Sequence, residues 1–122
     1  MAQNKVFRFG PIALTATTTT NLLNPPTATG GTNGGSSSQY IVLRHIHISN
    51  KTAGAVTFSL WIDATGGNTA GKEFIGTAVS VAANSYYDWY GMVRLDAADF
   101  LVGGASANTS LTINGEGEIG VA

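Results

Sequence analysis

Apolar and polar residues alternate along much of this chain, which is the pattern of a β-strand with one buried face. Over residues 55–63, one face of such a strand carries only apolar side chains, those of Val56, Phe58, Leu60 and Ile62. The opposite face carries Thr57, Ser59, Trp61 and Asp63. Because a helix would need apolar residues every three or four positions, this segment predicts a strand that packs on a core through one face.

The last segment, residues 110–121, repeats the alternation with glycines on its apolar side. Asn114-Gly115 could instead form the turn of a hairpin, because Asn-Gly favours the type I′ turn. The alternation continues unbroken through Gly115 and Gly117, however. We therefore expect one long strand, bulged at the glycines.

Further strands are predicted from β-branched and aromatic segments that are bounded by turn residues. These strands are expected at residues 5–9, 12–18, 39–50, 73–81 and 86–95. Short connections suggest that residues 39–50 form a hairpin with residues 55–63, and that residues 73–81 form another with residues 86–95. Only residues 95–101 favour helical character, as a single turn with Asp96 at its N-cap.

About seven or eight short strands separated by frequent turns predict an all-β fold, an antiparallel β-sandwich or jelly roll. The 122 residues are the length of one domain, so we expect a single β-sandwich domain over residues 1–122. Residues 24–38 are rich in Pro, Gly and Ser and predict a long, flexible, exposed loop. We expect this loop or the N-terminal segment to reach a partner.

Charge is sparse in this chain: only 11% of residues are Asp, Glu, Lys or Arg, against about 25% in ordinary soluble domains. So little charge is typical of a surface that partners cover.

The net charge is −1 without a concentrated basic patch, so we expect no nucleic-acid partner. Neither a long apolar stretch nor a secretory signal is evident, which predicts no membrane contact. The absence of cysteine excludes disulfides.

His45 and His47 lie two residues apart on a predicted strand, so both imidazoles should project from one face. Cupins bind metal through a His-x-His pair on a jelly-roll strand. A catalytic metal site normally takes three protein ligands, and only a carboxylate such as Asp63 or Asp88 could supply the third here. The alternative is a pair of hydrogen-bonded or half-exposed imidazoles. We expect that alternative, with no metal and no other cofactor.

Glu116 and Glu118 share the polar face of the last predicted strand. Paired carboxylates act as acid and base in glycosidases, but a solvated strand edge, or ion pairs with Arg8, Arg44 or Arg94, would explain these two as well. No Gly-x-Ser-x-Gly motif singles out a nucleophile. We therefore expect no catalytic residues and a protein that is not an enzyme.

Four aromatic residues fall within residues 86–90, and a strand must divide them between its two faces. We expect Tyr87 and Trp89 to join the core, and Tyr86 and Tyr90 to point outward. Trp61 lies on the outward face of its own strand. Exposed aromatic residues mark subunit interfaces or carbohydrate platforms, although a loop of the same domain could also cover them. The candidate interface residues are Trp61, Tyr86 and Tyr90.

The run YIVLRHIHISNKTAGAVTFSLWID, followed by ANSYYDWYG, LDAADFLVGGASA and TSLTINGEGEIGVA, resembles small structural proteins of tailed bacteriophages. The resemblance covers residues 40–122 and includes no catalytic residue. It implies a capsid decoration (cement) protein that is made in the host cytoplasm and located in the virion on the capsid surface. Such a protein would form a homotrimer, bind the major capsid protein and stabilise the shell.

Two other functions remain open at this point. A carbohydrate- or receptor-binding β module, such as a phage tail component, would use the exposed aromatic residues. A cupin-like metal enzyme would use His45 and His47.

Overall fold

The computed structural model describes residues 5–23, 40–96 and 99–120. These residues form eight β-strands and no helix, which confirms the predicted all-β class. The strands are β1 (Lys5–Ala13), β2 (Thr20–Leu23), β3 (Tyr40–Asn50), β4 (Val56–Asp63), β5 (Val79–Val81), β6 (Ser85–Leu95), β7 (Phe100–Ala105) and β8 (Leu111–Gly120).

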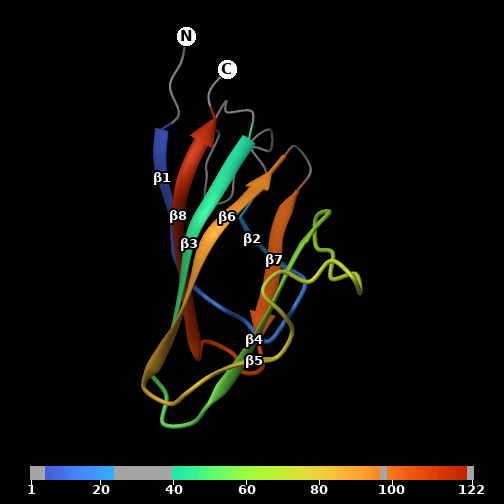
Figure 1. The fold of residues 1–122 in the computed structure, drawn as a ribbon. Helices are drawn as coiled ribbons and strands as arrows, with labels where there is room; N and C mark the ends of the chain where they lie inside the picture. The colour runs from blue at the N-terminus through green and yellow to red at the C-terminus, as the bar shows by residue number, and fades with distance from the viewer. Residues whose placement is uncertain (1–4, 24–39, 97–98, 121–122) are drawn as a thin grey trace.

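The strands form two antiparallel sheets that pack as a β-sandwich (Figure 1). One sheet has the order β1–β8–β3–β6, and the other has the order β2–β7–β4–β5. Every connection except the one from β4 to β5 leads from one sheet to the other. As a result, neighbouring strands in a sheet come from distant parts of the sequence.

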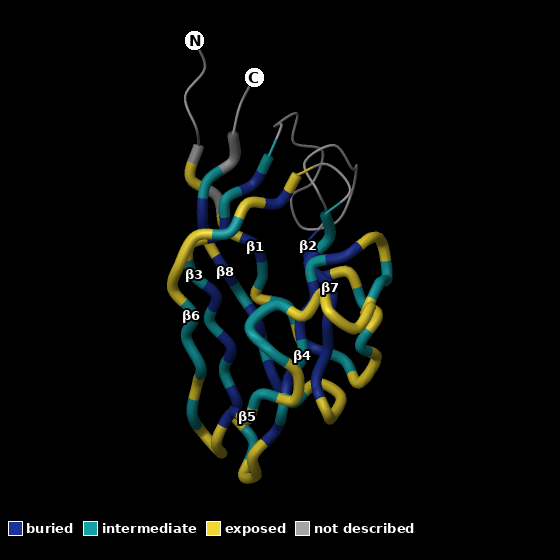
Figure 2. The backbone as a smooth tube through the Cα atoms, turned by 45° about the vertical axis from the view of Figure 1, so that its right-hand side comes forward, coloured by how far each residue is buried: buried dark blue, intermediate teal, exposed yellow. Residues whose placement is uncertain are grey.

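The core lies between the sheets and is filled by the inward side chains of both. Buried and partly exposed positions alternate along β3 and β8 (Figure 2). Large and fully buried residues include Phe9, Ile41, Leu43, Ile46, Ile48, Phe58, Leu60, Leu95 and Leu101. Each such side chain contributes about 1.5–3 kcal/mol through burial, so the alternation itself is the main determinant of the sandwich.

Strand β8 runs through Gly115 and Gly117 without a turn, as the alternation predicts, but the bulges lie in its partners β1 and β3 and not at these glycines. Both glycines lie on the buried face of the strand. A Cβ atom at Gly115 would collide with the ring of Phe9, and one at Gly117 would collide with the backbone carbonyl of Val42. The glycines therefore let the core and the neighbouring strand β3 approach β8 closely.

Both predicted hairpins are wrong. Strand β3 pairs with β6 and β8, whereas β4 pairs with β5 and β7 in the opposite sheet. Within residues 73–81 only Val79–Val81 form a strand, and this strand pairs with β4 rather than β6. A short reversal of the chain serves a hairpin and a crossing between sheets equally well, so its turn residues do not distinguish the two.

The N-terminal region also differs from the prediction. Strand β1 extends to Ala13 across a cis Gly10-Pro11 bond, and β2 lies at Thr20–Leu23 instead of at residues 12–18. The predicted flexible loop at residues 24–38 falls outside the described residues.

The expected helical turn at residues 95–101 falls partly outside the described residues, which leave out 97–98. Leu95 ends β6 and Phe100 begins β7. Between them, the backbone N–H of Asp99 donates to the carbonyl oxygen of Asp96 at 3.0 Å, and the Asp96 N–H donates to the Asp99 carboxylate at 2.9 Å. Two hydrogen bonds therefore link Asp96 and Asp99 between β6 and β7. The described part of the chain contains no helix that is long and apolar enough to cross a membrane.

Candidate functional site

An irregularity in β3 turns two consecutive side chains toward the outer face of the β1–β8–β3–β6 sheet. The pairing of β3 with both neighbours shifts register between Leu43 and His45. Leu43 and Ile46 are fully buried, while Arg44 is exposed and His45 is partly exposed. Strict alternation would have placed His45 on the same face as Leu43. The bulge thus moves both histidines of β3 to the outside.

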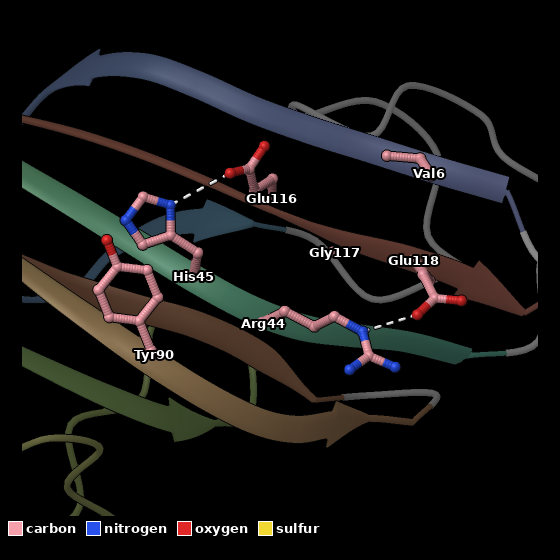
Figure 3. A pocket seen from close by; sticks show the side chains of 7 residues that line it. All are labelled: Val6, Arg44, His45, Tyr90, Glu116, Gly117 and Glu118. Atoms are coloured by element: carbon pink, nitrogen blue, oxygen red, sulfur yellow. Dashed lines mark hydrogen bonds and ion pairs between the residues drawn. The ribbon is translucent and has the colours of Figure 1, made fainter.

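Four ionisable side chains from three adjacent strands form a chain of hydrogen bonds on this outer face. Nε2 of His45 lies 2.8 Å from Oδ1 of Asp88, and Nδ1 of His47 lies 2.7 Å from the same oxygen. On its other side, Nδ1 of His45 lies 3.2 Å from Oε1 of Glu116 (Figure 3). Strand register explains the arrangement, because Asp88 pairs directly with His47 and Glu116 pairs directly with His45.

The carboxylates control the charge of His45. Burial alone would lower the pKa of its imidazole, but hydrogen bonds to Asp88 and Glu116 and the negative charges of both groups outweigh it and raise the pKa. The hydrogen bonds from His45 and His47 lower the pKa of the Asp88 carboxyl group, against the opposing effect of burial. The cluster therefore favours an ionised Asp88 beside a charged His45.

Two exposed tyrosines of β6 lie against the histidines. The ring of Tyr90 stacks on His45 with centroids 4.6 Å apart and an interplanar angle of 11°. The ring of Tyr86 is tilted over His47 at a centroid distance of 5.4 Å. Tyr86 is 64% exposed and Tyr90 is 72% exposed, so their predicted outward position is confirmed. We call this outer surface of the β1–β8–β3–β6 sheet the histidine face.

The other two aromatic residues of β6 point into the sandwich, as predicted. The Tyr87 ring meets Phe58 edge to face at a centroid distance of 5.4 Å. The Trp89 ring meets Phe74 in the same manner at 5.0 Å. Both are partly buried against the core. Their burial fixes which side of β6 faces outward.

Trp61 is only 7% exposed, so the prediction that it lies on an open surface is wrong. After β4 the chain does not leave the sheet but returns beside it. The Ile62 N–H donates to the carbonyl oxygen of Lys72 at 3.2 Å, and the Phe74 N–H donates to that of Leu60 at 2.8 Å. Trp61 faces away from the core, yet the folded chain itself covers it, and it is not available as an interface residue.

A shallow pocket of about 410 Å³ opens on the histidine face (Figure 3). It is lined by Val6, Arg44, His45, Tyr90, Glu116, Gly117 and Glu118. Nε of Arg44 lies 2.6 Å from Oε2 of Glu118. Of the three arginines considered as partners of this carboxylate, Arg44 is therefore the one that pairs with it. Glu116 binds His45 instead. The pocket therefore combines an aromatic ring with charges of both signs.

Of the two carboxylates that could join the histidines, the structure brings only Asp88 to them. Asp63 lies at the end of β4 in the other sheet. Its carboxylate accepts hydrogen bonds from the N–H groups of Ala64 and Thr69, at 2.7 and 3.0 Å, and from Nζ of Lys72 at 3.2 Å. These bonds hold the pKa of Asp63 well below its usual range, the contacts with Thr69 being the largest cause. Asp63 is thus a residue that organises a loop.

The sequence alone does not predict that Glu116 binds His45 or that Arg44 and Val6 line the same pocket. The signal that could have found them is strand register, since Val6 and Glu118 pair across β1 and β8 while His45 and Glu116 pair across β3 and β8. That register follows from pairings between distant strands. No protein-family model, curated protein or solved structure matches this chain.

Proposed function

We propose that this chain is a structural protein of a tailed-phage virion, a capsid decoration protein that binds the major capsid protein as a homotrimer and stabilises the shell. The distribution of exposed apolar side chains carries this proposal. Among the described residues, the large hydrophobic side chains that remain exposed are Val6, Tyr86, Tyr90 and Met92. All of them belong to β1 and β6, in the same sheet.

We assign the histidine face to the contact between copies of the chain. Interfaces are enriched in Tyr, Met and Arg, and this region carries Tyr86, Tyr90, Met92 and Arg44. The charged groups on the face include both signs, so a neighbouring copy meets no single-sign repulsion. Because three-fold closure makes each contact heterologous, this face would meet a different surface of the next copy. The low charge content of the chain, 11%, supports the same assignment.

The order of the strands supports a jelly-roll form of the sandwich. Jelly rolls consist of eight strands in two sheets and recur in viral capsid domains and lectins. Here eight strands form two four-stranded sheets, and the connections pass repeatedly between them. Such a domain offers a rigid outer sheet for assembly, and it needs no catalytic residues for that role.

Light scattering on the untagged chain tests the oligomeric state. We expect a particle with three times the 12.5 kDa mass of the chain. The double variant Tyr86→Ala/Tyr90→Ala should be a monomer, whereas Thr77→Ala/Ser80→Ala, a matched exposed pair beside the other sheet, should remain a trimer. A wild-type monomer at all concentrations would contradict the trimer.

Co-sedimentation tests the shell contact. Capsids of the source phage that lack this chain should bind it to saturation and become more resistant to heat. Binding that the double tyrosine variant loses would support the proposal. A wild-type chain that stays in the supernatant would contradict the decoration function.

A carbohydrate-binding module is the second candidate, favoured by the pocket. Tyr90 offers an exposed ring beside Arg44, Glu116 and Glu118, a combination of stacking surface and hydrogen-bonding groups that suits a sugar. Glycan-array binding that Tyr90→Ala abolishes would favour this function. No binding to any glycan on the array, together with saturable binding to capsids, would favour the decoration function.

A further inference from the structure

We propose that His45, His47 and Asp88 form a binding site for a divalent transition-metal ion of the Zn²⁺ type. One possible ligand atom from each residue lies within 4.8 Å of the others. Two imidazoles and a carboxylate are ligands that Zn²⁺ accepts, as do Co²⁺ and Ni²⁺. The inference goes beyond the assembly role and does not depend on it.

The distances within the cluster are close to those that a metal needs. Oδ1 of Asp88 lies 2.8 Å from Nε2 of His45 and 2.7 Å from Nδ1 of His47. Tetrahedral Zn²⁺ with bonds of about 2.0–2.1 Å separates its ligand atoms by roughly 3.3 Å. Small rotations of the three side chains would therefore replace the shared hydrogen bonds by metal–ligand bonds.

Glu116 completes the arrangement as a positioning residue for His45. A histidine that binds metal commonly donates its second ring N–H to a carboxylate, which fixes the tautomer and the ring orientation. Nδ1 of His45 faces Oε1 of Glu116 at 3.2 Å, leaving Nε2 directed at Asp88 and at the metal position. The stacked ring of Tyr90 restrains the same imidazole.

The scaffold holds the three ligands on regular strands. His45 and His47 are two residues apart on β3, and Asp88 is the register partner of His47 on β6. Ligands on paired strands are better fixed than ligands on loops. In the single chain the side chains are between 21% and 33% exposed, so an ion can reach them from solvent. A site with three protein ligands leaves a coordination position, which water would fill in the free chain.

Metal titration of the untagged chain is a sharp test, because His45 and His47 are its only histidines and it has no cysteine. Calorimetry with Zn²⁺ should show one saturable site per chain. Affinity should fall at least 10-fold in His47→Ala and in Asp88→Ala. Glu116→Ala should weaken binding about 10- to 100-fold. Glu118→Ala removes the same charge two residues along the same strand and should leave the affinity unchanged.

Long-range ¹H–¹⁵N NMR of the wild-type chain identifies the ligand atoms without any variant, so it remains decisive if a variant fails to fold. Addition of Zn²⁺ should shift Nε2 of His45 and Nδ1 of His47, while Nδ1 of His45 keeps its proton. The proposal is overturned by the absence of saturable binding, by binding that His47→Ala and Asp88→Ala leave intact, or by unchanged ring nitrogens. Light scattering on metal-free protein reports trimer formation separately, so the two proposals can fail independently.

Discussion

The outer faces of the two sheets follow the same alternation but differ in what covers them. On the β2–β7–β4–β5 sheet, Trp61 and Val102 are register partners that face away from the core, and both are buried. On the histidine face, Tyr86 and Tyr90 occupy equivalent outward positions and remain open. The alternation decides which side chains point outward. Whether an outward side chain meets solvent depends on the rest of the fold.

Two segments of the chain lie along the covered face. The carbonyl oxygens of Thr15 and Thr17 lie directly over Gly104 of β7, and the Ala105 N–H donates to Thr15 at 2.8 Å. The loop after β4 is tied to β2, because the side chain of Asn21 accepts a hydrogen bond from the N–H of Gly66 at 2.8 Å. Because β2 and the loop lie on either side of β7, this hydrogen bond joins them across the outer face of that strand. The histidine face has no equivalent segment among the described residues.

The largest expected difference between the two faces is in the free energy of unfolding when one outward aromatic side chain on each is cut back to alanine. Trp61→Ala should lower the free energy of unfolding by about 3–5 kcal/mol, because it leaves a cavity under the covering segments. In the dissociated chain, Tyr90→Ala should cost about 1 kcal/mol or less, since it removes only an exposed ring stacked on His45. Chemical denaturation measures both.

Trp61→Phe refines this comparison. The indole Nε1 of Trp61 is buried without a hydrogen-bond partner in the described structure, so its removal loses no bond. We expect Trp61→Phe to be clearly less destabilising than Trp61→Ala. Equal losses for Trp61→Ala and Tyr90→Ala would mean that the two faces do not differ in cover.

A glycine substitution tests the cover over β7. A Cβ atom at Gly104 would lie 2.6 Å from the carbonyl oxygen of Thr17 and 2.7 Å from that of Thr15. Gly104→Ala should therefore cost about 1–3 kcal/mol in the free energy of unfolding. Gly54→Ala is the matched control, because no atom lies within 4 Å of its Cβ position. A silent Gly104→Ala would show that residues 15–17 do not lie on this face.

The pH dependence of stability tests the loop that covers Trp61. Asp63 holds this loop, and its pKa is lower in the folded chain than in the unfolded chain. Its contribution is therefore present above the unfolded pKa and is lost as pH falls below about 4. Thermal unfolding from pH 7 to pH 2 should show a smaller decline for Asp63→Asn than for the wild type. An equal decline in thermal stability for Asp63→Asn and the wild type would contradict this role of Asp63.

The smallest effect is expected on the histidine face. Arg44 and Glu118 form a surface ion pair whose side chains are 49% and 31% exposed. In the dissociated chain, Arg44→Ala should change the free energy of unfolding by about 0.5 kcal/mol or less. The change should shrink further in 1 M salt, which screens exposed charges. A loss of several kcal/mol would mean that this face contributes to the core.

The sequence predicted local properties well and relations between distant strands poorly. Alternation located β4 and β8, and it correctly divided Tyr86 and Tyr90 from Tyr87 and Trp89. Strand pairing could not be read, because crossings between sheets and hairpins use similar turns. For Trp61, the error came from a cover made by segments distant in sequence.

The candidate site was predicted only in part, for the same reason. The spacing of His45 and His47 indicated a shared face, and Asp88 was one of two carboxylates considered. Only the register between β3 and β6 selects Asp88, and only the bulge at Arg44 turns the histidines outward. Neither the register nor the bulge has a short sequence signature.

Hydroxyl-radical footprinting measures most directly whether one outer face is covered by its own chain and the other by a second copy. In dilute, dissociated chain, Tyr86 and Tyr90 should be oxidised readily while Trp61 is not. In the assembled trimer, both tyrosines should become protected and Trp61 should remain unreactive. The account is contradicted if Trp61 reacts as fast as the tyrosines in the free chain, or if Tyr86 and Tyr90 react equally before and after assembly.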